Sequence, residues 1–292
     1  MAPAVDLIVV NYNAGTAIAE CLDAAAADLG GVDWQGIVVD NASADGSADG
    51  LERGRPRVRV VGNAVNAGFG AAINQAARLS DAPLLWLLNP DASVRAGAFA
   101  ALKAVLDAHA TCAIAAPRLV NADGSTQESA RGEPTPWTGL FGRHGLLTKL
   151  FPDSAMARRN LQASALVAQG VDSAAVDWVM GAAMLVRRQA FDLAGGFDER
   201  YFLYWEDADL CHRLRDKGWA TRYVPGAVVD HPGGRSSGTA YALATREFHR
   251  SAYRYYATHV VPSPWHPLRW FARVALTARA WLRIAVQAIA RP

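Results

Sequence analysis

The sequence contains only three cysteines in 292 residues, and none of them has a neighbour at zinc-ligand spacing. We therefore expect free thiols in a reducing compartment rather than a disulfide-stabilised scaffold. No uncharged apolar run reaches the ~18 residues that a membrane-spanning helix requires. A basic segment followed by an apolar core is also missing from the first residues, so we expect no signal peptide.

An excess of charge of one sign is absent as well. Lys and Arg total 29 against 27 Asp and Glu, and the resulting net charge of +2 gives no overall nucleic-acid signature. The chain is 51% hydrophobic and 19% charged, which is typical of a globular protein. Its length suffices for one large domain or two small ones.

A strand that ends in polar residues lies near the middle of the first half. Residues 84–91 read Leu-Leu-Trp-Leu-Leu-Asn-Pro-Asp. A short apolar run bounded by breakers is typical of a strand buried in a parallel sheet, and Pro90 cannot continue its hydrogen bonds. Asp91 would follow the carboxyl end of this strand. It could cap a helix near residues 96–107, or bind Mg²⁺ or Mn²⁺ together with a diphosphate.

Other predicted strands end in the same way. The apolar runs near residues 5–10, 37–39 and 58–61 are followed by Asn11, by Asp40 and by Asn63 with Asn66. Strands that alternate with helical stretches predict an α/β fold with a mostly parallel central sheet flanked by helices. Asn and Asp also initiate turns, but the repeated pattern favours a ligand crevice at one edge of the sheet.

The second half carries an aromatic loop that leads into an acidic helix start, residues 197–209. Acidic residues complement the dipole at a helix start, and Asp209 can pair with Arg213 four residues later. Asp207 is different, because the aromatic residues before it would wall a pocket where a carboxylate can act as a general base. His231 follows an apolar run, and a lone histidine in that position is either structural or a ligand.

These segments, in this order, resemble the family 2 glycosyltransferases of GT-A fold, and among them the bacterial rhamnosyltransferases. The resemblance covers residues 5 to about 240. It rests on Asp40-Asn41 with Ser43 and Asp45-Gly46-Ser47, on Asn66-Ala67-Gly68-Phe69-Gly70 with Asn74, on Asn89-Pro90-Asp91, on residues 204–210 with Arg213, and on His231.

The resemblance implies roles for individual residues on the donor side. Asn11, Asn13 and Asp40 would contact the base and ribose of a nucleotide sugar. Asn66, Gly68 and Phe69 would line the nucleotide-sugar site. Asn89 and Asp91 occupy the family's Asp-x-Asp position, where Asn89 replaces the first Asp and removes one charge from the metal site. Asp91 would bind Mg²⁺ or Mn²⁺, and His231 would complete the metal shell.

The resemblance also implies the acceptor side and the reaction. Trp178, Gly181 and Trp205 would border the acceptor, and Glu206 with Asp207 would be the catalytic acidic pair, with Asp207 as the base. The metal would offset charge on the leaving diphosphate while Asp207 takes the proton of the acceptor hydroxyl, which inverts the anomeric centre. The expected donor is dTDP-rhamnose, with UDP-galactofuranose and UDP-GlcNAc as alternatives.

The resemblance divides the chain into a catalytic domain, residues 1–240, and a helical tail, residues 241–292. Residues 129–175 would be a variable insertion on the acceptor side. Near residues 268–289 a last helix carries four arginines on one face and Trp270, Phe271 and Trp281 on the opposite one. Such a helix lies in a membrane interface or packs on the enzyme or on a homodimer partner. The first alternative implies a polyprenyl-linked glycan acceptor and a cytoplasmic protein on the inner face of the membrane.

Two other classes of protein compete with this interpretation. A nucleotide-binding dehydrogenase would need a third glycine after Gly68 and Gly70, but Ile73 stands there. A non-catalytic relative could bind nucleotide or glycan as a scaffold. The joint presence of Asp91, Asp207 and His231 favours an enzyme.

Overall fold

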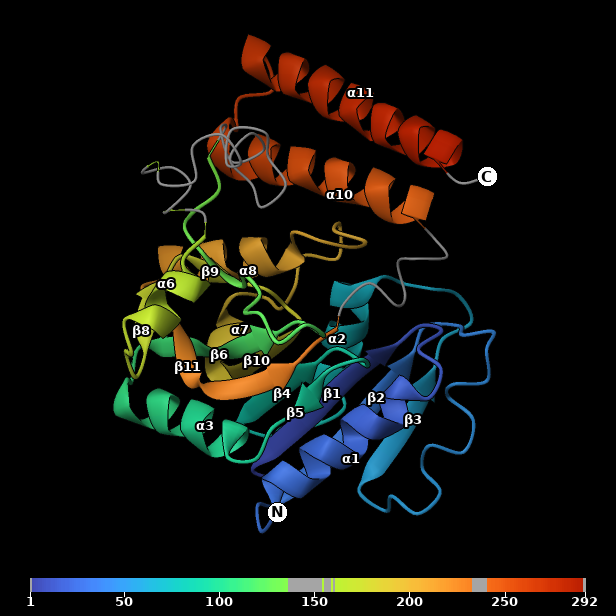
Figure 1. Cartoon of the computed structure of the whole chain (residues 1–292), viewed down its shortest axis with the longest axis vertical. Helices are drawn as coiled ribbons and strands as arrows, with labels where there is room; N and C mark the ends of the chain where they lie inside the picture. Colours follow the sequence, from blue (N-terminus) through green and yellow to red (C-terminus); the bar gives the residue numbers. More distant parts are fainter. Residues whose placement is uncertain (1, 136–153, 155–158, 160, 233–240, 291–292) are drawn as a thin grey trace.

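The computed structural model describes residues 2–135, 154, 159, 161–232 and 241–290, and Figure 1 shows the arrangement of its elements. The strands are β1 (Val5–Asn11), β2 (Trp34–Asp40), β3 (Val58–Gly62), β4 (Leu84–Leu88), β5 (Ser93–Val94), β6 (Cys112–Val120), β7 (Ala130–Arg131), β8 (Ala174–Val176), β9 (Trp178–Val179), β10 (Ala183–Arg187) and β11 (Ala220–Asp230). The helices are α1 (Ala17–Leu29), α2 (Phe69–Ala77), α3 (Ala98–Ala108), α6 (Ala163–Ala168), α7 (Arg188–Leu193), α8 (Glu206–Asp216), α10 (Tyr241–Tyr255), the π-helix η1 (Tyr256–Val260) and α11 (Pro267–Ala290).

The central sheet has the order β3-β2-β1-β4-β10-β6-β11-β5, and β8 also pairs with β11. Strands β1 to β4 pair in parallel, as do β6 and β11, whereas β10 runs antiparallel between β4 and β6. The fold is therefore α/β with a mostly parallel sheet, as the sequence predicts. Gly181 lies in the turn that leads into the antiparallel strand β10. Because β10 lies between β4 and β6, this turn is next to the middle of the sheet.

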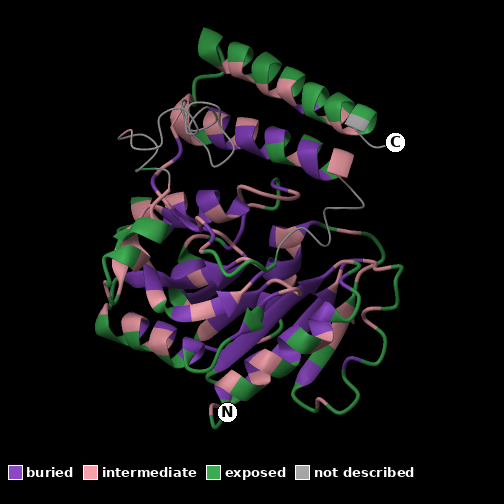
Figure 2. Ribbon diagram, in the orientation of Figure 1, coloured by how far each residue is buried: buried purple, intermediate pink, exposed green. Residues whose placement is uncertain are grey.

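Helices cover both faces of this sheet, and the side chains of β1 show why. Leu7 and Val9 pack in one core with α1 and α3, while Ile8 and Val10 pack in the other with α2, α7 and α8. This alternation is the two-residue period of a strand that is buried on both sides. Figure 2 shows the buried sheet between its helical layers and the exposed outer surface of α11.

The structure excludes one of the two interpretations of Asp91. Helix α3 begins at Ala98, and the carboxylate of Asp28 binds its first backbone N–H groups, at 2.5 Å from Gly97 N and 2.7 Å from Phe99 N. Strand β5 separates Asp91 from that helix. The helix-cap interpretation of Asp91 is therefore wrong, and its carboxylate lies beside His231 instead.

The second half differs from the expected pattern in two places. Residues 220–230 form one strand with an irregularity between Val224 and Val228, rather than a strand that turns at Pro225-Gly226. The predicted last helix is present as α11, but a second long helix, α10, precedes it and packs along it. Much of the predicted insertion at residues 129–175 lies outside the described residues, and within it β7, α6 and most of β8 are observed.

Gly68 connects the start of α2 to the loop before α8. It has φ +91°, and a Cβ there would lie 2.5 Å from the carbonyl oxygen of Phe202, whose oxygen accepts the Phe69 N–H at 3.1 Å. We expect Gly68→Ala to lower the thermal midpoint more than Gly97→Ala does. Gly97→Ala is the control. Gly97 also has a positive φ, of +83°, but an added Cβ would meet nothing within 4 Å, so this substitution has only the backbone cost of about 1–2 kcal/mol. Equal midpoints by calorimetry would contradict this account.

Candidate active site

Polar residues predicted on the donor side converge where β1 and β2 end. The Asn11 side-chain amide donates to Asp40 Oδ1 at 2.8 Å and lies within hydrogen-bond distance of the hydroxyl groups of Ser43 and Ser47. Asn11 is fully buried, and its Oδ1 has no protein partner in the described part of the chain. The end of β1 therefore positions the carboxylate of Asp40, which is half-buried at the same edge of the sheet.

The loops after these strands bring in the remaining predicted donor-side residues. Asn13 has φ +51°, and its side-chain oxygen accepts the Ala44 N–H at 2.8 Å, which joins the loops after β1 and β2. Asn66 accepts the Gly68 N–H at 2.9 Å. The buried Asn41, which we did not predict as a site residue, donates to the Gly68 carbonyl at 3.1 Å. Phe69 follows at the first position of α2.

The predicted metal ligands meet although they come from distant parts of the sequence. His231 Nε2 lies 3.4 Å from Asp91 Oδ1 and 3.2 Å from the side-chain nitrogen of Asn89. Asp91 and Asn89 follow β4, and His231 follows β11, so the carboxyl ends of two strands form this part of the site. A cavity of about 390 Å³ opens beside Asp91.

Gln127 orients His231, and sequence reasoning did not identify it. Gln127 Oε1 lies 3.1 Å from His231 Nδ1, and Gln127 Nε2 donates to the His231 carbonyl at 2.5 Å. Because the amide nitrogen is used at that carbonyl, the amide oxygen faces Nδ1 and accepts its proton. The lone pair of the imidazole is thus at Nε2, on the side of Asp91, and the Asn89 amide donates to it.

This donor set fits a hard divalent cation. One carboxylate and one imidazole face the same point, and a histidine ligand is commonly fixed by a hydrogen bond to its other ring nitrogen. No group of three or more His, Cys, Asp or Glu residues forms a metal cluster within the described residues. Mg²⁺ and Mn²⁺ sites in phosphate-transfer enzymes often use one or two protein ligands, with substrate oxygens and water as the others.

We expect Gln127→Leu to weaken Mn²⁺ binding by roughly 10–100-fold, because the imidazole loses the acceptor that fixes its tautomer and orientation. Electron paramagnetic resonance titration of free Mn²⁺ measures the affinity without an activity assay. Gln169→Leu, an exposed change at the end of α6, is the matched control. If the two variants bind Mn²⁺ equally well, Gln127 does not orient a ligand.

The acidic pair lies at the first turn of α8, after two residues with positive φ, Tyr204 (67°) and Trp205 (70°). Asp207 Oδ2 accepts the Gly181 N–H at 2.9 Å, and its Oδ1 accepts the Ala208 N–H at 2.7 Å. Burial raises the pKa of Asp207 despite these two hydrogen bonds. A half-buried carboxylate with a raised pKa is suited to accept a proton.

Glu206 has a different environment from its neighbour. Its side chain is buried, and its Oε2 has no hydrogen-bond partner within the described chain. Burial, and then the charge of Asp207, raise the pKa of Glu206 well above its usual range. The geometry therefore suits Asp207 as the proton acceptor and leaves Glu206 as a carboxyl that favours the neutral state.

The turn between β9 and β10 connects the two halves of the site. The Asn89 N–H donates to the Ala182 carbonyl at 2.8 Å, and the adjacent Gly181 N–H donates to Asp207. Asp207 does not line the cavity beside Asp91, so this backbone turn is the observed link between them. A Cβ at Gly181 would lie 3.6 Å from the Phe69 ring, which also faces this turn.

The predicted acceptor-side tryptophans stack on each other. The rings of Trp178 and Trp205 have centroids 6.4 Å apart at an angle of 22°. Trp178 Nε1 donates to the Gly132 carbonyl, and the guanidinium of Arg131 lies 5.1 Å from the centroid of the Trp178 ring. Trp205 is half-buried and directly precedes the acidic pair in the sequence.

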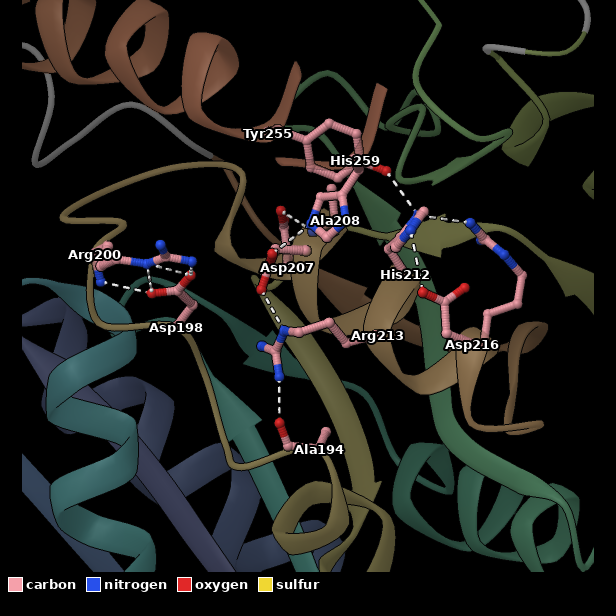
Figure 3. A network of polar contacts seen from close by, with 12 residues as sticks. Ala194, Asp198, Arg200, Asp207, Ala208, His212, Arg213, Asp216, Tyr255 and His259 are labelled. Atoms are coloured by element: carbon pink, nitrogen blue, oxygen red, sulfur yellow. Dashed lines mark hydrogen bonds and ion pairs between the residues drawn. The ribbon is translucent and has the colours of Figure 1, made fainter. Parts of the chain in front are cut away.

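Helix α8 is fixed by polar contacts with the C-terminal elements, as Figure 3 shows. Asp209 binds Arg213 at 2.7 Å, which confirms the predicted pair, and it also lies 2.7 Å from His259 Nε2 of η1. Tyr255 of α10 approaches His212 of α8 at 3.4 Å. The tail is thus directly bonded to the helix that carries the acidic pair.

Comparison with known proteins agrees with this arrangement. Residues 6–162 match the family model described as Glycosyl transferase family 2. The chain is 34% identical over 263 residues to the N-acetylglucosaminyl-diphospho-decaprenol L-rhamnosyltransferase of Mycobacterium tuberculosis, covering 85% of this chain and 82% of that protein. It is 40% identical over 82 residues to the rhamnosyltransferase WbbL of Escherichia coli, covering 28% of this chain and 31% of that protein.

Among solved structures, a mannosyltransferase from Pyrobaculum calidifontis in complex with GDP-Man and Mn²⁺ superposes with a TM-score of 0.58 at 17% identity, covering 98% of this chain and 71% of that chain. The fold and site therefore define a glycosyltransferase of GT-A fold. The chain belongs to glycosyl transferase family 2.

Proposed function

We propose that this protein is an inverting, metal-dependent transferase that moves L-rhamnose from dTDP-rhamnose to a hydroxyl group of a polyprenyl-linked glycan in cell-envelope polysaccharide synthesis. The observation that carries the proposal is the pair Asp91–His231 at the strand ends, linked through the Gly181–Ala182 turn to Asp207. The choice of donor and acceptor is supported by the name of the mycobacterial relative.

In this mechanism Asp91 and His231 would hold Mg²⁺ or Mn²⁺, which supplies charge neutralisation for the leaving diphosphate. Asn11, Asn13 and Asp40 would bind the nucleoside, and Asn66, Gly68, Phe69 and Asn89 would line the sugar diphosphate. Trp178, Gly181 and Trp205 would orient the acceptor. Asp207 would take the proton from its attacking hydroxyl, and the oxygen would approach the anomeric carbon from the face opposite the diphosphate.

A donor panel tests the proposal most simply. We would measure release of nucleoside diphosphate from dTDP-rhamnose, UDP-galactofuranose and UDP-GlcNAc with a GlcNAc-diphospho-lipid acceptor, with and without Mn²⁺. Release from dTDP-rhamnose alone, dependent on metal and acceptor, is the expected result. Release from a UDP-sugar would identify that compound as the donor in place of dTDP-rhamnose. Release from none of the three would favour a non-catalytic scaffold.

We further propose that residues 1–240 form the catalytic unit, with a variable acceptor-side insertion at 129–175, and that residues 241–292 attach it to the inner face of the cell membrane. No helix in the described ranges is long and apolar enough to span a bilayer. Helix α11 instead packs on α10 and exposes several large apolar side chains: Leu268, Trp270, Phe271, Val274, Trp281, Leu282, Val286 and Ile289. An exposed apolar helix face of this kind suits a membrane interface.

We expect the double variant Trp270→Glu/Phe271→Glu to lose binding to phosphatidylglycerol vesicles in a sedimentation assay. Both side chains are exposed, at 71% and 66%, so the fold should be retained. Ala104→Glu/Ala108→Glu on the exposed face of α3 adds the same charge and should still sediment. Unchanged sedimentation of the first variant would contradict the membrane proposal. Loss of a dimer by light scattering, without loss of vesicle binding, would assign this face to a homodimer.

A further inference from the structure

A second cavity, of about 590 Å³, lies between α10, η1 and α11, and no step described above uses it. Its wall is strongly basic. Six arginines contribute to it: Arg200, Arg246, Arg250, Arg254, Arg269 and Arg273.

The positive charge of this cavity is only partly balanced by the protein. No carboxylate contributes to its lining, and the chain contains no Asp or Glu after Glu247. Arg200 pairs with Asp198 at 2.6 Å, and Arg250 lies 3.6 Å from Glu247. The other four arginines have no carboxylate partner within the described residues.

Those four guanidinium groups instead contact aromatic rings and neutral oxygens. Arg246, Arg254 and Arg273 lie over the rings of Trp281, Tyr201 and Tyr253, at 5.6, 5.8 and 5.9 Å. Arg269 donates to the Pro262 carbonyl at 2.9 Å and to the Tyr253 hydroxyl at 3.4 Å. Stacked guanidinium groups keep N–H donors available, and their fork matches phosphate oxygens.

The position of the cavity relates it to the proposed reaction. Arg200 belongs to the loop of residues 197–205 that leads into the acidic pair, and Arg254 stacks on Tyr201 of the same loop. Ser251 of α10 donates to the Leu203 carbonyl at 3.0 Å, which holds this loop against α10. The opposite wall is α11, which also carries the exposed Trp270 and Phe271 outside the cavity lining.

We propose that this arginine-lined cavity binds the diphosphate of a lipid-linked acceptor. The inference rests on the proposed function. The sugar would extend along the 197–205 loop toward Asp207, and the lipid would leave across the exposed apolar surface of α11. A diphosphate, which has two adjacent charged groups, matches several unneutralised guanidinium groups better than the single phosphate of a bilayer phospholipid.

The test compares two double variants that each remove two positive charges. Arg269→Gln/Arg273→Gln changes the cavity while keeping much of each side-chain stem, and Arg59→Gln/Arg283→Gln is the control, with two exposed arginines that do not line the cavity. Calorimetric titration with farnesyl diphosphate is done with saturating dTDP and Mn²⁺, so that the probe cannot occupy the donor diphosphate site.

We expect the cavity variant to bind farnesyl diphosphate at least about tenfold more weakly, and the control to bind it like the original protein. The KM for a GlcNAc-diphospho-lipid acceptor should rise correspondingly, while the KM values for the donor and for benzyl β-N-acetylglucosaminide, which lacks phosphate, stay unchanged. Circular dichroism melting of all variants verifies that they are folded.

Three results would overturn the inference: unchanged affinity in the cavity variant, an equal loss in the control, or a loss that affects only binding to phosphatidylglycerol vesicles. The last result would assign the cavity to bilayer headgroups. Failure of the proposed function is a separate result, because the original protein would then release no nucleoside diphosphate from any donor.

Discussion

Asp207→Asn is expected to lower sugar transfer by roughly 10²–10⁴-fold while nucleotide binding is retained. The amide is isosteric with the carboxylate and can still accept the Gly181 N–H, so the turn that joins the two halves of the site should persist. It cannot accept a proton from the acceptor hydroxyl. Single-turnover kinetics with dTDP-rhamnose, together with calorimetric binding of dTDP, measure the two effects separately.

The pH dependence follows from the state of the same carboxylate. Because burial raises the pKa of Asp207 above the ordinary value of 3.8, the protonated, inactive form persists to a higher pH than for an exposed aspartate. The transfer rate of the original protein should therefore rise with pH through this raised pKa and then level off. In Asp207→Asn this ascending limb should be missing.

The control for this substitution is Asp216→Asn on the same helix. Asp216 lies at the other end of α8, is 65% exposed and, among the described residues, pairs with His212 alone, at 3.4 Å. The Asp216→Asn substitution changes the charge of the helix by the same amount as Asp207→Asn, but it does not affect the turn at Gly181. Normal turnover by Asp207→Asn, or an equal loss of activity in Asp216→Asn, would show that Asp207 is not the catalytic base.

Asp91→Asn should raise the Mn²⁺ concentration that gives half-maximal activity at least about 100-fold. Asn89 already supplies an amide where a second carboxylate could stand, so Asp91 is the one carboxylate ligand of the proposed site, and its loss leaves only the imidazole of His231. Chelation with EDTA should abolish transfer by the original protein, and added Mn²⁺ should restore it.

A nearby carboxylate provides the matched control. Asp230 precedes His231 and lines the same cavity, but it is paired with Arg95 at 2.6 Å and is 40% exposed. Asp230→Asn should leave the metal requirement unchanged. If Asp91→Asn and the original protein show the same Mn²⁺ dependence, or if EDTA has no effect on either, the proposed metal site is wrong.

The sequence predicts that Asp91 and His231 lie together because a simple rule applies there. Polar residues after buried strands gather at one edge of a mostly parallel sheet, and this places Asp91 near His231 although the two are far apart in the chain. The apolar run before Asp91 and the one before His231 are both visible in the sequence. The same rule predicts the meeting of Asn11 and Asp40, which are hydrogen-bonded in the structure.

The other features of the site depend on tertiary geometry that no local sequence pattern predicts. Gln127 reaches His231 only because the hairpin after β6 folds back beside β11, and nothing in its local sequence distinguishes it from a surface glutamine. The direction of β10 is equally hidden, since an apolar run does not tell whether a strand is parallel or antiparallel. The positive φ values of Tyr204 and Trp205 are also unexpected for bulky residues, and they set the start of α8.

The amphipathic pattern of the last helix likewise predicted only part of its environment. The pattern predicts a helix that lies in a membrane interface or packs on the enzyme or on a homodimer partner. In the structure Arg269 and Arg273 line the cavity between α11 and α10, a helix that the sequence pattern does not predict, while Trp270 and Phe271 remain exposed. A basic cavity therefore arises between two helices that share no sequence motif.

The most direct test of this account is a crystal structure of the protein with dTDP and Mn²⁺, with the metal located by its anomalous scattering. The account predicts one peak within about 2.5 Å of an Asp91 oxygen and of His231 Nε2, with both phosphates of the nucleotide at that ion and Asp207 facing the space beyond them. A diphosphate bound elsewhere, or a metal peak that contacts neither Asp91 nor His231, would contradict it.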